Sequence, residues 1–112
     1  TRVPNNIIKI VKAAYDENLS LPISQRAAYK DENGKRVPGT GMRTARRLMS
    51  GAVDLAQLRL MLAWFARHGA SEKESKQRQD KTSKASRAWR LWGGSSGLRW
   101  AKQAAKELET KE

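Results

Sequence analysis

The sequence predicts an all-α fold, a compact bundle of about five short helices with a long N-terminal loop and a charged linker. Apolar residues recur at intervals of three and four in five separate segments, and capping residues or glycines bound most of these segments. The chain has 112 residues, which is the size of one domain with a modest core. We therefore expect a single helical domain over 1–112, with an N-terminal helix and loop in 1–40, the core of the bundle in 41–103 and a charged tail in 104–112.

The first helix is expected from about Asn5 to Glu17. Pro4 suits the first turn of a helix, where a missing N–H costs nothing. One face of this segment is apolar and consists of Ile7, Ile8, Val11, Ala14 and Tyr15.

Between Asn18 and Gly41 the helical pattern disappears, and prolines and glycines become frequent. The dipeptide Asn33-Gly34 predicts a tight turn, and the piece from Ile23 to Lys30 fits either a short helix or a strand-like edge. The remainder is expected to be a long loop, and loops of this length are usually functional or mobile.

The second helix is expected from Thr40, as the capping residue, to Ser50, with Gly51 placed to stop it. At 100° per residue its apolar and basic side chains fall on opposite sides. The apolar side holds Met42, Ala45, Leu48 and Met49, and the basic side holds Arg43, Arg46 and Arg47.

Asp54 is a suitable cap for a third helix that extends to His68 and ends at Gly69. This segment is apolar on almost all sides, with four leucines, Met61, a tryptophan and a phenylalanine. We therefore expect it to be the most buried element of the bundle.

The stretch from Ala70 to Thr82 has dense mixed charge and no apolar periodicity, which predicts a solvated, mobile linker. Ser83 then caps a fourth helix that ends at Gly93 and Gly94. One face of this helix holds Ala85, Ala88, Trp89 and Trp92, and another holds Lys84, Arg87 and Arg90.

A fifth helix is expected to open at Ser95 or Ser96, before the charged tail. Its apolar residues recur at helical spacing. They are Leu98, Ala101, Ala105 and Leu108.

The charge balance favours a polyanionic partner. Lys and Arg number 23 against 11 Asp and Glu, which gives a formal net charge of +12, and such a balance promotes association with nucleic acid. No apolar run approaches the roughly 20 residues that span a bilayer, so no membrane partner is expected.

The chain lacks the residues that several kinds of catalytic and metal site require. The chain contains no cysteine, so disulfides, thiolate metal sites and cysteine nucleophiles are excluded. The segment GTGMR lacks the Gly-Lys-Ser/Thr ending of a phosphate loop, and the carboxylates are scattered. His68, the sole histidine, is interpreted as a helix-end capping residue. We therefore expect no enzymatic activity, metal, cofactor or small-molecule substrate.

Three segments between Gly41 and Gln103 carry a resemblance. They are TARRLMSG at 44–51, LMLAWFARH at 60–68 and SKASRAWRLWGGSSGLRWA at 83–101, and Trp92-Gly93-Gly94 with Gly97 and Trp100 is the specific part. This region resembles a small helical module of phage and prophage proteins, often attached to head-morphogenesis proteins related to the prophage serine protease XkdF. The resemblance implies a phage protein in the virion or the host cytoplasm.

The chain departs from that family at two places. Family members commonly carry a Gly-rich loop with Tyr-Pro where this chain has DKTSKAS at 80–86, and an Asp where it has Ser95. A partner contact made by that loop or that Asp in relatives is therefore not implied for this chain.

The two basic helical faces are the candidate nucleic-acid-binding sites. Guanidinium groups three and four residues apart lie side by side along a helix, at a spacing suited to successive phosphates of one strand. The candidate residues are Arg43, Arg46, Arg47, Lys84, Arg87 and Arg90. We expect binding to nucleic acid, with DNA favoured over RNA and with low sequence specificity.

Two further interpretations concern how nucleic acid would be read. Trp89, Trp92 and Trp100 are either a platform for stacking bases or large core side chains, and the core is favoured because a small domain needs them. The second and third helices are loosely spaced like a helix-turn-helix. The third helix offers mainly Gln57, Arg59 and Arg67 as polar readers, which disfavours sequence-specific readout.

Two other functions stay open. One is a virion structural protein of the head or neck, whose basic face contacts the packaged genome or acidic capsid or portal surfaces. The other is a small regulator that binds a host protein through the loop from Asn18 to Gly41.

Overall fold

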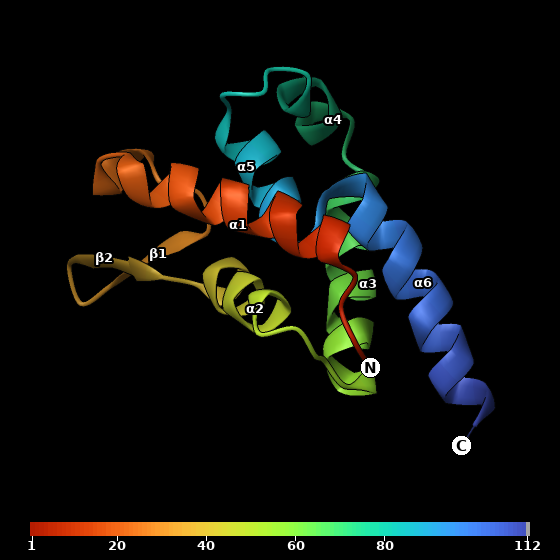
Figure 1. The fold of residues 1–112 in the computed structure, drawn as a ribbon. Helices are drawn as coiled ribbons and strands as arrows, with labels where there is room; N and C mark the ends of the chain where they lie inside the picture. Colours follow the sequence, from red (N-terminus) through yellow and green to blue (C-terminus); the bar gives the residue numbers. More distant parts are fainter. Residues whose placement is uncertain (112) are drawn as a thin grey trace.

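A computed structural model describes residues 1–111 as a mostly helical globule with one small sheet (Figure 1). None of the helices in this range has the length and apolar character needed to cross a membrane. The elements are α1 (Asn5–Ser20), the 3-10 helix η1 (Ile23–Gln25), β1 (Tyr29–Glu32), β2 (Lys35–Pro38), α2 (Thr40–Met49), α3 (Leu55–Gly69), α4 (Glu72–Arg78), α5 (Lys84–Leu91) and α6 (Gly94–Thr110).

The helices pack around one apolar core. Helices α3 and α6 lie along each other, and α1 crosses the molecule in contact with α2, α5 and α6 (Figure 1). Apolar spacing in each segment places one row of side chains inward, as the sequence predicts. The largest fully buried apolar residues are Ile7, Met42, Leu48, Leu58, Met61, Phe65, Leu91 and Trp92.

The five predicted helices correspond to α1, α2, α3, α5 and α6. Two of their predicted caps are confirmed, because the side chain of Asp54 accepts a hydrogen bond from the Gln57 N–H and that of Ser83 accepts one from the Ser86 N–H. Thr40 was predicted as a cap but is the first residue of α2, after Gly39.

The long N-terminal loop and the all-α class are corrected by the structure. Helix α1 continues to Ser20, and β1 and β2 then pair as an antiparallel hairpin between Tyr29 and Pro38. Asn33 and Gly34 form its turn with φ of 52° and 79°, the left-handed conformation that a two-residue hairpin turn requires.

The predicted linker and the predicted burial of the third helix are also corrected. The short helix α4 occupies most of 70–82, and Ser71 caps it by accepting from the Glu74 N–H. Helix α3 is buried along one face only, and Leu60 is 40% exposed, because α6 covers that inner face while the opposite face meets solvent.

Glycine is required where α5 meets α6. Gly93 has a φ of 107°, and a Cβ there would lie 2.9 Å from the Gly97 Cα. A Cβ on Gly97 would lie 3.0 Å from the carbonyl oxygen of Trp92, whose ring stacks on Trp64 at 4.7 Å. The Trp-Gly-Gly motif therefore has a steric basis. Because glycine has no Cβ, the chain can turn directly after the buried Trp92 and begin α6 at Gly94.

Asn18 joins α1 to the segment that leads into the hairpin. Its side chain is fully buried, and its Oδ1 accepts from the Ala27 N–H at 2.8 Å while its Nδ2 donates to the Ala27 carbonyl at 3.0 Å. Both backbone groups of Ala27 depend on this one amide, since buried polar groups need partners.

We predict that Asn18→Ala lowers the free energy of unfolding by about 2 to 4 kcal/mol, because two buried backbone groups lose their partner. Urea denaturation followed by circular dichroism measures this. The control Asn6→Ala removes an exposed amide from the same helix and should change stability by less than about 0.5 kcal/mol. Similar effects in the two variants would contradict the assignment.

A second stability prediction concerns Gly93→Ala, which we expect to cost at least about 2 kcal/mol from the left-handed backbone and the contact with Gly97 together. The control is Gly34→Ala, since Gly34 also has positive φ but a Cβ added there would meet nothing within 4 Å. That variant should lose only about 1 to 2 kcal/mol. Thermal or urea unfolding compares the two, and a smaller loss at Gly93 would refute the steric role.

Candidate nucleic-acid interface

Helix α2 presents three arginines on its outer side. Gly41, Met42, Thr44, Ala45 and Leu48 face inward and are buried, so the intervening positions project outward. These exposed residues are Arg43, Arg46 and Arg47, and together they form what we call the α2 arginine face.

Each arginine of the α2 arginine face contacts a neutral group. Arg43 donates to the Thr40 hydroxyl at 3.0 Å, Arg46 to the Tyr15 hydroxyl at 2.9 Å and Arg47 to the Gln57 side-chain oxygen at 2.7 Å. The hydrogen bond to Tyr15 raises the pKa of Arg46 above its already high ordinary value.

No arginine of this face is within ion-pair distance of a carboxylate belonging to residues 1–111. The hydrogen bonds orient the guanidinium groups without neutralising them. Three cations on neighbouring turns repel one another, and an external anion would relieve that repulsion.

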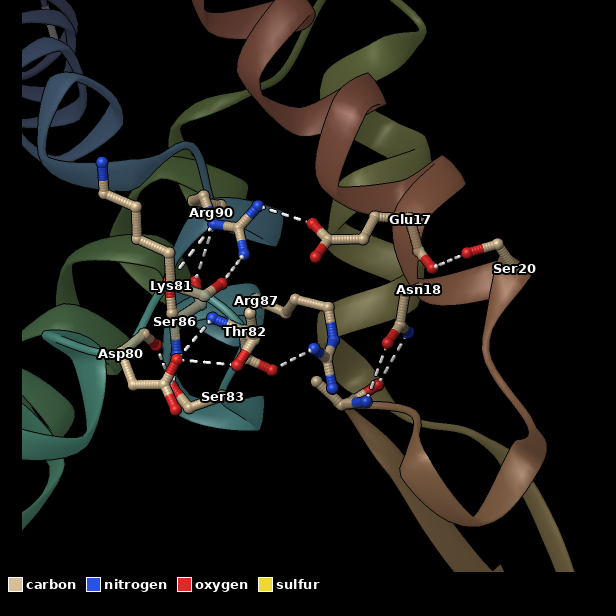
Figure 2. A network of polar contacts seen from close by, with 11 residues as sticks. Glu17, Asn18, Ser20, Asp80, Lys81, Thr82, Ser83, Ser86, Arg87 and Arg90 are labelled. Atoms are coloured by element: carbon tan, nitrogen blue, oxygen red, sulfur yellow. Dashed lines mark hydrogen bonds and ion pairs between the residues drawn. The ribbon is translucent and has the colours of Figure 1, made fainter.

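The second predicted basic stripe is not an exposed face. Arg87 is only 4% exposed and donates to the Thr82 carbonyl at 2.6 Å (Figure 2). It also donates to the Gln25 carbonyl at 2.8 Å. Arg90 forms a 2.7 Å ion pair with Glu17 and donates to the Lys81 carbonyl (Figure 2).

Lys84 is the exposed member of that stripe, and its ammonium group donates to the Ser24 carbonyl at 3.0 Å. Helix α5 packs on α1, and the segment after α1 also lies against it through Gln25 and Ser24. The polar side of α5 therefore meets other parts of the protein. Arg87 and Arg90 hold these elements together and are not free for a ligand.

The three predicted tryptophans differ in their exposure and in their contacts. Trp92 is 1% exposed and stacked on Trp64, so it belongs to the core. Trp89 is half-buried, its ring meets that of Phe65 in a T-shaped contact, and the guanidinium of Arg78 lies 4.0 Å from its ring centroid. Trp100 is half-buried and packs against the core. Trp89 and Trp92 therefore do not form an open platform for stacking bases.

The surface of α3 does not resemble a base-reading helix. Gln57, its best candidate reader, is 5% exposed and its amide is engaged by Arg47 and Thr44. Arg59 lies 3.5 Å from Glu109, and most of the outer side is made of Ala56, Leu60, Ala63 and Ala66. Arg67, the third predicted reader, is exposed, but the surface around it is largely apolar and offers few groups for base edges.

A basic stripe on α6 was missed by the sequence interpretation. Arg99, Lys102 and Lys106 are exposed and recur at helical spacing, the same signal that identified α2. None of them forms an ion pair within the described part of the chain. This α6 stripe is a useful comparison for the α2 arginine face because it carries the same charge.

His68 lies in a contact between helices. Its Nδ1 is 2.7 Å from Glu74 Oε1, and its ring lies 4.3 Å from that of Trp64. The contact with Glu74 attaches α4 to α3, and it stands in place of the capping role predicted from the sequence. Residues 1–111 contain no cluster of three or more His, Cys, Asp or Glu side chains suited to a metal ion.

Comparison of the chain with family models, curated proteins and solved structures finds no match.

We predict that Arg87→Gln lowers the free energy of unfolding by about 2 to 3 kcal/mol, because the carbonyls of Thr82 and Gln25 lose their donors. Arg43→Gln removes the same charge from an exposed site and should change stability by less than about 0.5 kcal/mol. Urea denaturation of both variants is the measurement. An Arg87 variant as stable as the Arg43 variant would make Arg87 a candidate binding residue again.

Proposed function

We propose that the protein binds nucleic acid, DNA in the first place, through the α2 arginine face and with little sequence preference. One observation carries the proposal: three exposed arginines on one helix are hydrogen-bonded only to neutral groups. Their charge is therefore available to an external anion.

Arginine suits a phosphate partner. The planar guanidinium offers several N–H donors in a fork that matches phosphate oxygens, and it is weakly hydrated. The hydrogen bonds to Thr40, Tyr15 and Gln57 restrict the rotamers of the three side chains, which reduces the entropy lost on binding. The net charge of +12 adds long-range attraction to a polyanion.

Low sequence preference follows from the type of contact. Phosphate contacts position a protein on nucleic acid but carry no direct sequence information. The outer surface of α3 is largely apolar and offers few groups for base edges. The proposed complex therefore depends on charge more than on hydrogen bonds to bases.

The resemblance to the phage module motivates the preference for DNA. A protein associated with a phage head meets the packaged genome, so a virion role and DNA binding are compatible. The host-regulator alternative depended on a mobile loop, and the corresponding residues instead form the end of α1, η1 and the hairpin.

The test is a titration of duplex DNA with two triple variants that each remove three positive charges. The interface variant is Arg43→Gln with Arg46→Gln and Arg47→Gln, and the control is Arg99→Gln with Lys102→Gln and Lys106→Gln on α6. We expect the interface variant to weaken binding at least about tenfold near 0.1 M salt and the control about threefold or less, because each phosphate contact contributes by releasing counterions.

The salt dependence gives a second readout of the same titration. The slope of log K against log salt should fall by about 2 to 3 in the interface variant, since about 0.9 of a counterion is released for each neutralised phosphate of duplex DNA. Equal weakening by the two variants would show that only net charge matters. Binding that is absent at low salt would end the proposal.

A further inference from the structure

A second basic feature shares no residue with the α2 arginine face. It is an open cleft of about 400 Å³ bounded by the hairpin on one side and by α4 and α5 on the other. The cationic and polar lining residues are Arg26, Tyr29, Arg36, Gln77 and Lys84, and small side chains such as Ala28, Ala85 and Ala88 line the rest.

The cleft carries more positive than negative charge. Arg26, Arg36 and Lys84 line it, and Glu74 is the one acidic residue among the lining residues. Glu74 is itself engaged by His68 at 2.7 Å.

Two of the cations in the cleft are bonded only to neutral groups. Arg26 donates to the carbonyls of Leu19 and Leu21 and to the Tyr29 hydroxyl, and Lys84 donates to the Ser24 carbonyl. These partners are neutral, so the charges remain.

Arg36 is the one cation of the cleft whose side chain forms no hydrogen bond within residues 1–111. Its Nε is buried and has no hydrogen-bond partner. Its one carboxylate contact within residues 1–111 is with Asp31 at 3.6 Å, and the Asp31 side chain is 76% exposed, so that attraction is largely screened by solvent. The charge of this partly buried guanidinium is therefore only weakly compensated within the described chain, and an anion bound in the cleft would compensate it further.

We propose that this cleft binds a phosphate group, which the guanidinium of Arg36 and the ammonium of Lys84 hold from opposite sides. The hairpin and the start of α5 position these two groups, and Gln77 and Arg26 have further N–H donors at the same cleft. A cleft of this size leaves room for the group that a phosphate ester carries, so we take the ligand to be a phosphate ester. The proposal does not rest on nucleic-acid binding by the α2 arginine face.

The experiment is a titration of the ¹⁵N-labelled protein with inorganic phosphate at constant ionic strength, followed by NMR at the backbone amides of Ala28 and Ala85 and at the arginine Nε–H groups. We compare Arg36→Gln with Lys35→Gln, which removes the same charge from an exposed neighbour in β2. We expect saturable shifts at the cleft, a dissociation constant raised at least about tenfold by Arg36→Gln, and little change with Lys35→Gln, because charge-assisted hydrogen bonds are directional.

Three results would overturn the site: no saturable shift at the cleft, equal weakening by the two variants, or shifts spread evenly over all basic surfaces. Lys84→Gln, on a different element, repeats the test if Arg36→Gln disturbs the hairpin. Arg43→Gln should leave phosphate binding unchanged, so a failure of the α2 proposal and a failure of the cleft proposal are separate outcomes.

Competition then identifies the source of the phosphate. A deoxynucleoside monophosphate and a short single-stranded oligonucleotide are each added to the phosphate-loaded protein. Displacement by the oligonucleotide assigns the cleft to the backbone of nucleic acid, and displacement by the monophosphate alone assigns it to a small phosphorylated molecule. If neither displaces phosphate, phosphate esters are not the ligands and the proposal fails.

Discussion

The packing around Trp92 determines where the other elements lie. Its ring stacks on Trp64 of α3, and a Cβ on Gly41 of α2 would lie 3.2 Å from its Nε1. The chain then turns at Gly93 directly into α6. Four helices thus meet at one buried side chain, and a close-packed interior of this kind tolerates little displacement. Because the inner side of α2 is fixed against this ring, its arginines are held on the outside.

Helix α5 shows why a charged helical stripe does not by itself identify a binding surface. Its polar side is opposed by α1 and by the segment after α1, so Arg87 and Arg90 find partners in Gln25 and Glu17. These partners are 62 and 73 residues away in sequence. Periodicity predicts which side of a helix is polar, but it cannot tell whether that side meets solvent or polar groups of the same chain.

Local signals predicted most of the helical fold. Asp54 and Ser83 cap helices through hydrogen bonds within three residues, and Asn33-Gly34 forms the expected turn. The hairpin was missed because each strand has four residues and little apolar alternation, and because its position depends on the side chain of Asn18, which binds the backbone of Ala27 nine residues later. Helix α4 was missed since it buries no residue and is attached mainly by His68, Glu74 and Arg78. The exposure of the α2 arginines was predictable because they lie opposite the buried row of their own helix, although Arg46 and Arg47 find their partners on other helices.

The partners of each cation show whether its charge is used within the fold or is available to a ligand. Arg87 and Arg90 are held by carbonyls and a carboxylate of the same chain. Within residues 1–111 the α2 arginine face forms no ion pair, and Arg36 forms one with the exposed carboxylate of Asp31 at 3.6 Å. These two features are joined by the short segment from β2 to α2, and the Gly39 N–H donates to the Ala28 carbonyl at 2.7 Å within it. A Cβ at Gly39 would lie 2.9 Å from that same oxygen. The close approach therefore fixes the hairpin against the start of α2, so the fold determines the spacing between the two proposed anion-binding regions.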